Sequence, residues 1–486
     1  FLLVFMLMVL TALSLPLKAQ MFGGLTTSLA NHMEYSFSTE TNDEILENWL
    51  DADFYFDNFT AGLRMELYQP KDPSLQFPGT DPVEEGITFR YFEYHHDNIQ
   101  ARVGNYYAMF GRGMTLRTYE DRDIRVDNNL EGVKFDVSYD RLSATFLSGR
   151  PEGPSDQRTD LIHGADLNLN LLDGVAFGGS YVSNSPNLRQ KAEITSGRTQ
   201  LSLSQETWML DLYGEYGKKT NSKGTGAYFS TSFTTAGFGL SCEYKYYHNF
   251  FFLSDDHFVT YNNPPALIRE HSYTLLNRHP YLLNADDEAG IQIEATFSPT
   301  PKTSLLANYS LTKDHEGKTI LGEGNTLYEE IYGEIEHHFS DDFFTIGALG
   351  LSKQRQDTYI TPVFEFTYSL DPVNSFRFVF QHQHTDSELL GEFDNQIYSL
   401  EYAHSPKYTL SLVGEWTNTS DLQEKLQNRP DEKNLWLFGK FDINISPNHD
   451  LSVMYGSRQA GFLCAGGVCR LEPEFEGIEV KLFSRL

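Results

Sequence analysis

The densest group of side chains that could recognise a charged solute lies between Tyr106 and Asn129. Arginines and acidic residues alternate there: Arg112, Arg117, Glu120, Asp121, Arg122, Asp123 and Arg125. Folded into a channel, such a loop would set opposing charges across a constriction, as selectivity regions do. The alternative is an external loop held by its own ion pairs, each stabilising by ~0–1 kcal/mol when exposed.

A second group of charges falls at alternate positions of stretches whose other positions are apolar. These residues are Asp51, Asp53, Arg64, Glu66, Arg90, Arg102, Lys134, Asp136, Glu243, Lys245, Glu334 and Glu336. On the lipid side of a barrel, Arg or Lys at the membrane midplane would cost ~2–4 kcal/mol. We therefore expect all of them to line the interior, where their mixed signs favour a network of ion pairs.

Other chemistry has little support. His382 and His384 have the spacing of one strand face, but no third ligand is near them in sequence, and we expect neither metal nor cofactor. Cys464 and Cys469 enclose a short glycine-containing loop, and an oxidising compartment favours a disulfide there. The sequence has no Gly-x-Ser-x-Gly elbow, Walker loop or His-Glu-x-x-His motif, so we expect no enzyme.

The elements that must position these charges are short strands. In Leu435 to Ile445, the residues Leu435, Leu437, Gly439, Phe441, Ile443 and Ile445 share one face, and polar residues dominate the other. This period of two recurs almost to the end of the chain. A high aromatic content (14%) with a mean hydropathy of -0.41 suits many strands with one apolar and one polar face.

Connections between the strands alternate between tight and long. Tight connections occur near Asp57-Asn58 and Asp140-Arg141, and longer polar ones near 113–129 and 253–289. Such alternation is typical of a transmembrane barrel with short periplasmic turns and longer extracellular loops. We predict an all-β, antiparallel transmembrane β-barrel of roughly 24 strands (22–24), both termini periplasmic. Residues 253–289 are the only connection that we expect to be long enough to fold inside.

The apolar run from Phe1 to Leu17, followed by Lys18-Ala19-Gln20, is typical of a secretory signal cleaved after Ala19. We expect a few residues to precede Phe1, and an uncleaved helical anchor is the alternative. Residues 20–486 then form a single barrel, since no linker or change of composition divides them. A net charge of -30 without a basic stripe argues against nucleic acid as a partner.

Three stretches resemble a family of porin-like Gram-negative outer-membrane barrels of unassigned function. They are GNYYAMFGRGMTLRTYEDRDIRVDNNLEGVKF (104–135), EYKYYHNF (243–250) and CRLEPEFEGIEVKL (469–482). The resemblance covers most of the mature chain. It implies a barrel in the outer membrane and carries over no substrate and no catalytic residues.

Together these observations predict an outer-membrane channel for small polar solutes, in contact with lipid. The alternative is a structural or partner-binding barrel that serves as a surface scaffold or as part of a secretion or adhesion assembly, with other envelope proteins as partners. The substrate is not encoded in any motif of the sequence.

Overall fold

The computed structural model describes residues 24–70, 84–151, 160–185, 191–220, 223–254, 259–279, 281–315, 324–419, 433–465 and 468–486, apart from the side chains of 84, 462–469 and 471. The predicted signal sequence, residues 1–19, lies outside this range. Within it, no helix is both long and apolar enough to cross a membrane.

In the described part of the chain, a 24-stranded antiparallel sheet forms the wall of the molecule. Its strands are β1 (Leu25–Ser38), β2 (Glu44–Phe56), β3 (Phe59–Gln69), β4 (Glu84–His96), β5 (Ile99–Tyr106), β10 (Leu130–Tyr139), β11 (Leu142–Pro151), β12 (Leu161–Leu172), β13 (Val175–Ser185), β14 (Glu193–Gln205), β15 (Trp208–Lys219), β16 (Thr225–Thr235), β17 (Phe238–His248), β18 (Asp287–Thr300), β19 (Thr303–Lys313), β20 (Thr326–His338), β21 (Phe343–Gln354), β22 (Asp357–Ser369), β23 (Asn374–Ser387), β24 (Gly391–His404), β25 (Tyr408–Thr417), β26 (Leu435–Ser446), β27 (His449–Arg458) and β30 (Phe475–Arg485).

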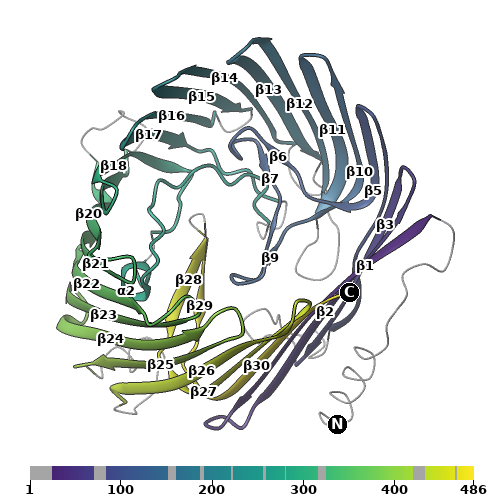
Figure 1. Ribbon diagram of the computed structural model, residues 1–486. Helices are drawn as coiled ribbons and strands as arrows, with labels where there is room; N and C mark the ends of the chain where they lie inside the picture. Colours follow the sequence, from purple (N-terminus) through teal and green to yellow (C-terminus); the bar gives the residue numbers. More distant parts are fainter. Residues whose placement is uncertain are drawn as a thin grey trace.

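The sheet closes because its first strand pairs with its last. The β1–β30 ladder runs from Ala30 opposite Arg485 to Ser38 opposite Gly477, and Figure 1 shows the resulting ring. Closure leaves no edge strand whose backbone groups would lack partners. The predicted barrel and its strand number are confirmed.

Tight turns gather at one end of the barrel. Asp57, Asp97 and Asp140 have φ values of 51°, 47° and 50° in the turns that follow β2, β4 and β10. Positive φ at such positions matches the right-handed twist of the paired strands, and Asp tolerates it better than most residues. The longer connections leave from the opposite end.

The two faces of the strands meet different surroundings. On β25 and β26, Leu412 and Leu437 point outward and are 51% and 55% exposed. Their neighbours alternate inward, and Ser411 of β25 lies opposite Lys440 of β26 in the ladder. The outer surface is therefore apolar and the inner one mainly polar, as the period of two predicts.

Three segments fold into the barrel (Figure 1). The first inward segment, 107–129, carries β6 (Met109–Phe110), β7 (Leu116–Arg117), β8 (Glu120–Asp121) and β9 (Val126–Asp127). The second inward segment, whose described residues are 249–254, 259–279 and 281–286, carries the short helix α2 (Thr274–Asn277), and the inward hairpin pairs β28 (Gly461–Ala465) with β29 (Val468–Glu472). The expectation that only 253–289 would fold inside was wrong, because shorter connections also turn inward and bond to the wall.

Exchange of an outward leucine for arginine tests the assignment of the two faces. We expect Leu412→Arg to lower the free energy of unfolding in lipid vesicles by about 2–4 kcal/mol, since a cation then faces hydrocarbon. Ser411→Arg, one residue away but facing the interior, should change it far less. Denaturant titration followed by tryptophan fluorescence measures both, and equal losses would contradict the assignment.

Candidate functional site

Ion pairs fasten the first inward segment to the wall at β2 and β3. Arg64 on β3 contacts Asp51 on β2 (Nε–Oδ1 2.6 Å) and Glu120 of the segment (Nη1–Oε1 2.8 Å). Arg122 of the segment contacts the same Glu120 at 2.6 Å and Glu66 on β3 at 3.4 Å. Opposite charges from wall and segment thus alternate in one chain of contacts, which holds the segment against the wall.

Further contacts extend this attachment. The Arg122 guanidinium lies 4.4 Å from the centroid of the Trp49 ring on β2, which adds a cation–π attraction. Arg125 pairs with Glu47, whose side chain is buried. The segment's charges therefore neutralise charges of the adjacent wall.

A glycine allows the same segment to approach β15. Glu215 accepts hydrogen bonds from the backbone N–H of Arg112 (3.0 Å) and from the hydroxyls of Tyr213 (2.6 Å) and Ser196 (2.7 Å). Gly111 has a φ of 58°, and a Cβ there would lie 2.3 Å from Glu215 Oε2. Only glycine fits this backbone conformation and this distance without displacement.

The two inward segments are bonded to each other. The backbone N–H of Arg117 donates to the Tyr261 carbonyl (2.7 Å), and Asn262 Nδ2 donates to the Met114 carbonyl (3.2 Å). The Tyr261 hydroxyl donates to Asp160 Oδ2 (2.7 Å). The segments thus form one interior layer rather than two independent loops.

A buried ion pair anchors the second inward segment near its end. Lys245 Nζ on β17 lies 2.6 Å from Glu288 Oε1 on β18, and both side chains are 0% exposed. Lys245 also donates to the Ala266 carbonyl at 2.5 Å. Glu288 accepts from the Tyr281 hydroxyl and from the Asn284 backbone N–H. The pair is satisfied on all sides, which is the condition under which buried charges are tolerated.

Helix α2 docks on amide side chains of β23. The Leu275 N–H donates to Gln381 Oε1 (2.9 Å), and Gln383 Nε2 donates to the Leu275 carbonyl (2.8 Å). His279 donates from Nε2 to Gln383 Oε1 (2.9 Å) and stacks on Tyr359 at 3.8 Å. Burial lowers the pKa of His279 to about 4, so its ring packs as a neutral group at pH 7.

The second inward segment also reaches the far side of the barrel. Arg278 pairs with Glu415 on β25 and donates to Gln459 Oε1 at 2.5 Å, just before the inward hairpin begins. One guanidinium therefore connects the segment, the wall and the base of the hairpin.

An apolar cluster fills the interior beside β10 to β17. Its buried members come from both inward segments and from inward positions of the wall: Tyr106, Ala108, Phe110, Met114, Leu116, Leu130, Leu147, Ile162, Val182, Ile194, Tyr213, Tyr228, Tyr247, Phe250, Phe252, Tyr261, Leu267 and Ala285. A cluster of this size stabilises the segments by burial of apolar area. Sequence reasoning missed it, because it expected the inner face to be polar throughout.

Elsewhere the interior wall is accessible to water. Lys440 and Asp442 on β26 form a pair at 3.0 Å and are 44% and 39% exposed. Lys481 on β30 contacts Glu34 on β1 at 3.0 Å, and its side chain is 42% exposed. These charges face inward and yet are solvated, unlike the buried charges under the segments.

Most of the predicted interior charges that remain have neighbours on the same wall. Asp53 accepts from the Tyr91 hydroxyl, Arg102 contacts Glu93, Lys134 contacts Asp136, Glu243 accepts from the Tyr228 hydroxyl, Glu334 accepts from the Tyr332 hydroxyl, and Glu336 contacts His338. Asp121 caps the turn of the first inward segment by accepting from the N–H of Asp123. The expected network of mixed charges thus consists mainly of local pairs.

Arg90 is an exception, and its expected interior position was wrong. It lies opposite the outward-facing Leu63, and its side chain is 67% exposed and contacts Glu131. A register shift in the β3–β4 pairing changes the alternation on β4. Phe89 therefore points inward instead and stacks on Tyr107 of the first inward segment at 5.4 Å.

The remaining candidate groups are two histidines on the wall and two cysteines in the inward hairpin. His384 and His382 contact the same carboxylate, that of Asp394, at 2.9 and 3.6 Å, on the outward face of β23 and β24. Cys464 and Cys469 are backbone partners in the inward hairpin. Their side chains lie outside the described part, so the disulfide stays a prediction.

A closed sheet with an apolar exterior and a polar, partly filled interior defines a β-barrel of the outer-membrane kind. A chain of the E. coli P pilus tip assembly intermediate PapC-PapD-PapK-PapG has this fold (TM-score 0.53, 9% identity, 97% of this chain and 62% of that chain). The chain belongs to the family of unknown function DUF6029, which matches residues 1–486. The predicted membership of a barrel family without an assigned function is confirmed.

Other solved structures are similar at lower scores. The translocation pore of the P pilus usher PapC gives a TM-score of 0.47 at 9% identity, over 95% of this chain and 99% of that chain. OccK5 (OpdH) from Pseudomonas aeruginosa gives 0.42 at 10%, over 81% and 97%. No curated protein matches the sequence significantly.

Loss of the glycine contact should loosen the first inward segment. In Gly111→Ala, the new methyl group collides with Glu215 and the residue keeps a positive φ, which costs on the order of 1–3 kcal/mol. We expect faster amide hydrogen exchange at 107–129. Gly197→Ala is the control, since nothing lies within 4 Å of a Cβ at Gly197; comparable exchange in the two variants would contradict the role of the contact.

The buried pair predicts non-additive mutations. Lys245→Met leaves the Glu288 carboxylate buried without its cation and should lower the free energy of unfolding by about 3–5 kcal/mol. The double variant Lys245→Met/Glu288→Leu removes both charges and should recover most of that loss. Denaturant unfolding of both variants measures these free energies. A double variant as unstable as the single one would contradict a coupled ion pair.

Proposed function

We propose that the protein is a porin-like outer-membrane channel for small polar solutes. The observation that carries the proposal is the water-accessible set of inward charges on β1, β26 and β30, such as Lys440 and Lys481. Side chains alone do not fill a barrel of this strand number, so space remains unless other segments occupy it. Solvated charged walls of this type stabilise polar solutes in transit.

The inward segments then act as a constriction. They are bonded to the wall by ion pairs at Arg64, Arg122 and Arg278 and narrow the interior from the end with the long connections. The charges of the inward segments are mostly paired with the wall. We therefore infer that selectivity among solutes arises from the water-exposed ion pairs of β1, β26 and β30 and from the width of the part of the interior that the segments leave open. We infer that the barrel is oriented in the outer membrane with its long connections on the extracellular side and both termini on the periplasmic side.

The apolar interior cluster favours a second candidate, a structural or partner-binding barrel. A dry core inside β10 to β17 provides rigidity and does not help the passage of polar solutes. The two functions differ in one measurement. Ion current across a planar bilayer supports the channel, and its absence from correctly folded protein supports the scaffold.

Charge selectivity gives a sharper test. Lys481→Gln removes a cation from the interior and leaves Glu34 without its lysine partner, so we expect the reversal potential in a salt gradient to shift toward greater cation preference. Arg90→Gln is the matched control, because it removes the same charge from the outward face. An equal shift in both variants, or none in either, would contradict a pathway past Lys481.

A further inference from the structure

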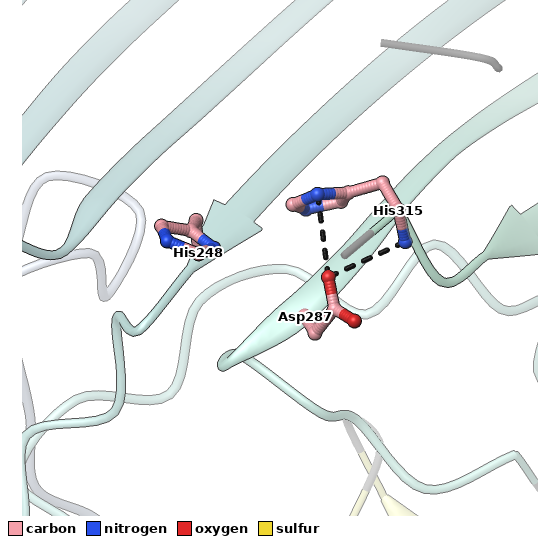
Figure 2. A group of neighbouring side chains, drawn as sticks. All are labelled: His248, Asp287 and His315. Carbon is pink, nitrogen blue, oxygen red and sulfur yellow. Dashed lines mark hydrogen bonds and ion pairs between the residues drawn. The ribbon is translucent and has the colours of Figure 1, made fainter. Parts of the chain in front are cut away.

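Three potential metal ligands meet at the base of the second inward segment. His248 is the last residue of β17, Asp287 is the first residue of β18, and the two are opposite each other in the ladder. His315 follows β19 by two residues, and its ring lies over Asp287 (Figure 2). One ligand atom of each residue lies within 4.8 Å of the other two.

The contacts of His315 determine which of its nitrogens is available. Nε2 lies 2.7 Å from the Tyr247 carbonyl oxygen, which can only accept, so Nε2 carries a hydrogen. In the neutral ring, Nδ1 then presents a lone pair, and it faces Asp287 Oδ1 at 3.2 Å. Two acceptors at this distance repel unless a proton or a cation lies between them.

This arrangement matches a metal-binding histidine. Such histidines typically donate their second ring N–H to a backbone carbonyl or a carboxylate, which orients the ring and selects the tautomer. For a tetrahedral ion with bonds near 2.0–2.1 Å, two ligand atoms are separated by about 3.3 Å. The 3.2 Å between Nδ1 and Oδ1 is close to that separation.

His248 supplies a third donor. Its Nδ1 is buried and has no hydrogen-bond partner within the described part of the chain, while Nε2 lies 3.2 Å from the amide nitrogen of Asn249. Because this amide nitrogen donates, Nε2 accepts and Nδ1 carries the hydrogen of the neutral ring in this arrangement. Rotation of the Asn249 amide by about 180° exchanges the two roles and gives Nδ1 the lone pair that a metal needs. The ligand atom of His248 lies within 4.8 Å of the other two, so a shift of the ring can bring it to the tetrahedral separation of about 3.3 Å.

We propose that His248, Asp287 and His315 bind one divalent transition-metal ion of the Zn²⁺ type, with water in the fourth position. Two imidazoles and one carboxylate suit Zn²⁺, whereas Ca²⁺ and Mg²⁺ prefer oxygen ligands alone. His248 and Asp287 directly flank residues 249–286. A metal here joins the two ends of the second inward segment and adds the β19–β20 connection through His315, which restricts how far the segment can move.

The test is isothermal titration calorimetry of the full-length folded protein in detergent, stripped with a chelator and titrated with ZnCl₂. We expect one saturable site whose affinity falls at least tenfold in His248→Gln and in His315→Gln. His384→Gln is the matched control, because His384 also contacts an aspartate but lies away from the cluster. Zinc should also slow amide exchange at 249–254 and 281–286.

Two further measurements keep the result interpretable. Circular dichroism shows whether each variant has the wild-type strand content, and electron paramagnetic resonance of the Cu²⁺-loaded wild type reports whether two imidazole nitrogens bind the ion. Absence of saturable binding, or unchanged binding in His248→Gln and His315→Gln, would overturn the site and leave an ordinary His315–Asp287 ion pair. None of these readouts depends on whether the barrel conducts ions.

Discussion

The constraint on which the structure depends is the absence of water around the backbone of a membrane-spanning sheet. Unpaired N–H and C=O groups in hydrocarbon cost several kcal/mol each, so a spanning sheet is stable only when every strand has two neighbours. Pairing of β1 with β30 meets this requirement. The outward leucines, phenylalanines and valines are then solvated by lipid, and the period of two sends the alternate residues inside.

Closure creates an interior space, and the polar groups that line it need water or other protein groups as partners. At 24 strands, side chains from the wall alone do not fill it. The protein fills part of it with its own connections, and two kinds of interaction hold these in place. Beside β10 to β17 the contacts are mainly apolar, whereas at β2, β3, β18 and β25 they are buried or half-buried ion pairs and hydrogen bonds.

This division separates the interior into a packed part and a solvated part. Charges under the inward segments, such as Lys245 and Glu288, are buried in ion pairs that hold the segments in place. Charges on β26 and β30 remain exposed to water. In the proposed channel, the solute pathway depends on how firmly the segments are held, and the proposed metal site lies at the base of the second segment, between His248 and Asp287.

The sequence by itself determined the closed antiparallel barrel, its strand number and the inward position of most charges, because side-chain period and turn chemistry are local properties. Arg90 shows where prediction from local sequence fails. A register shift in the β3–β4 pairing changes which side chains of β4 face inward, and the register depends on both strands and not on the sequence of one. The residues that contact the inward segments could not be predicted from the sequence either. Asn262, Gln381 and Gln383 carry no charge and follow no motif, and they matter only because chain folding brings them against Met114, Leu275 and His279. The same holds for His248, Asp287 and His315, which are separated by tens of residues in sequence and meet because antiparallel neighbours place the ends of successive strands together.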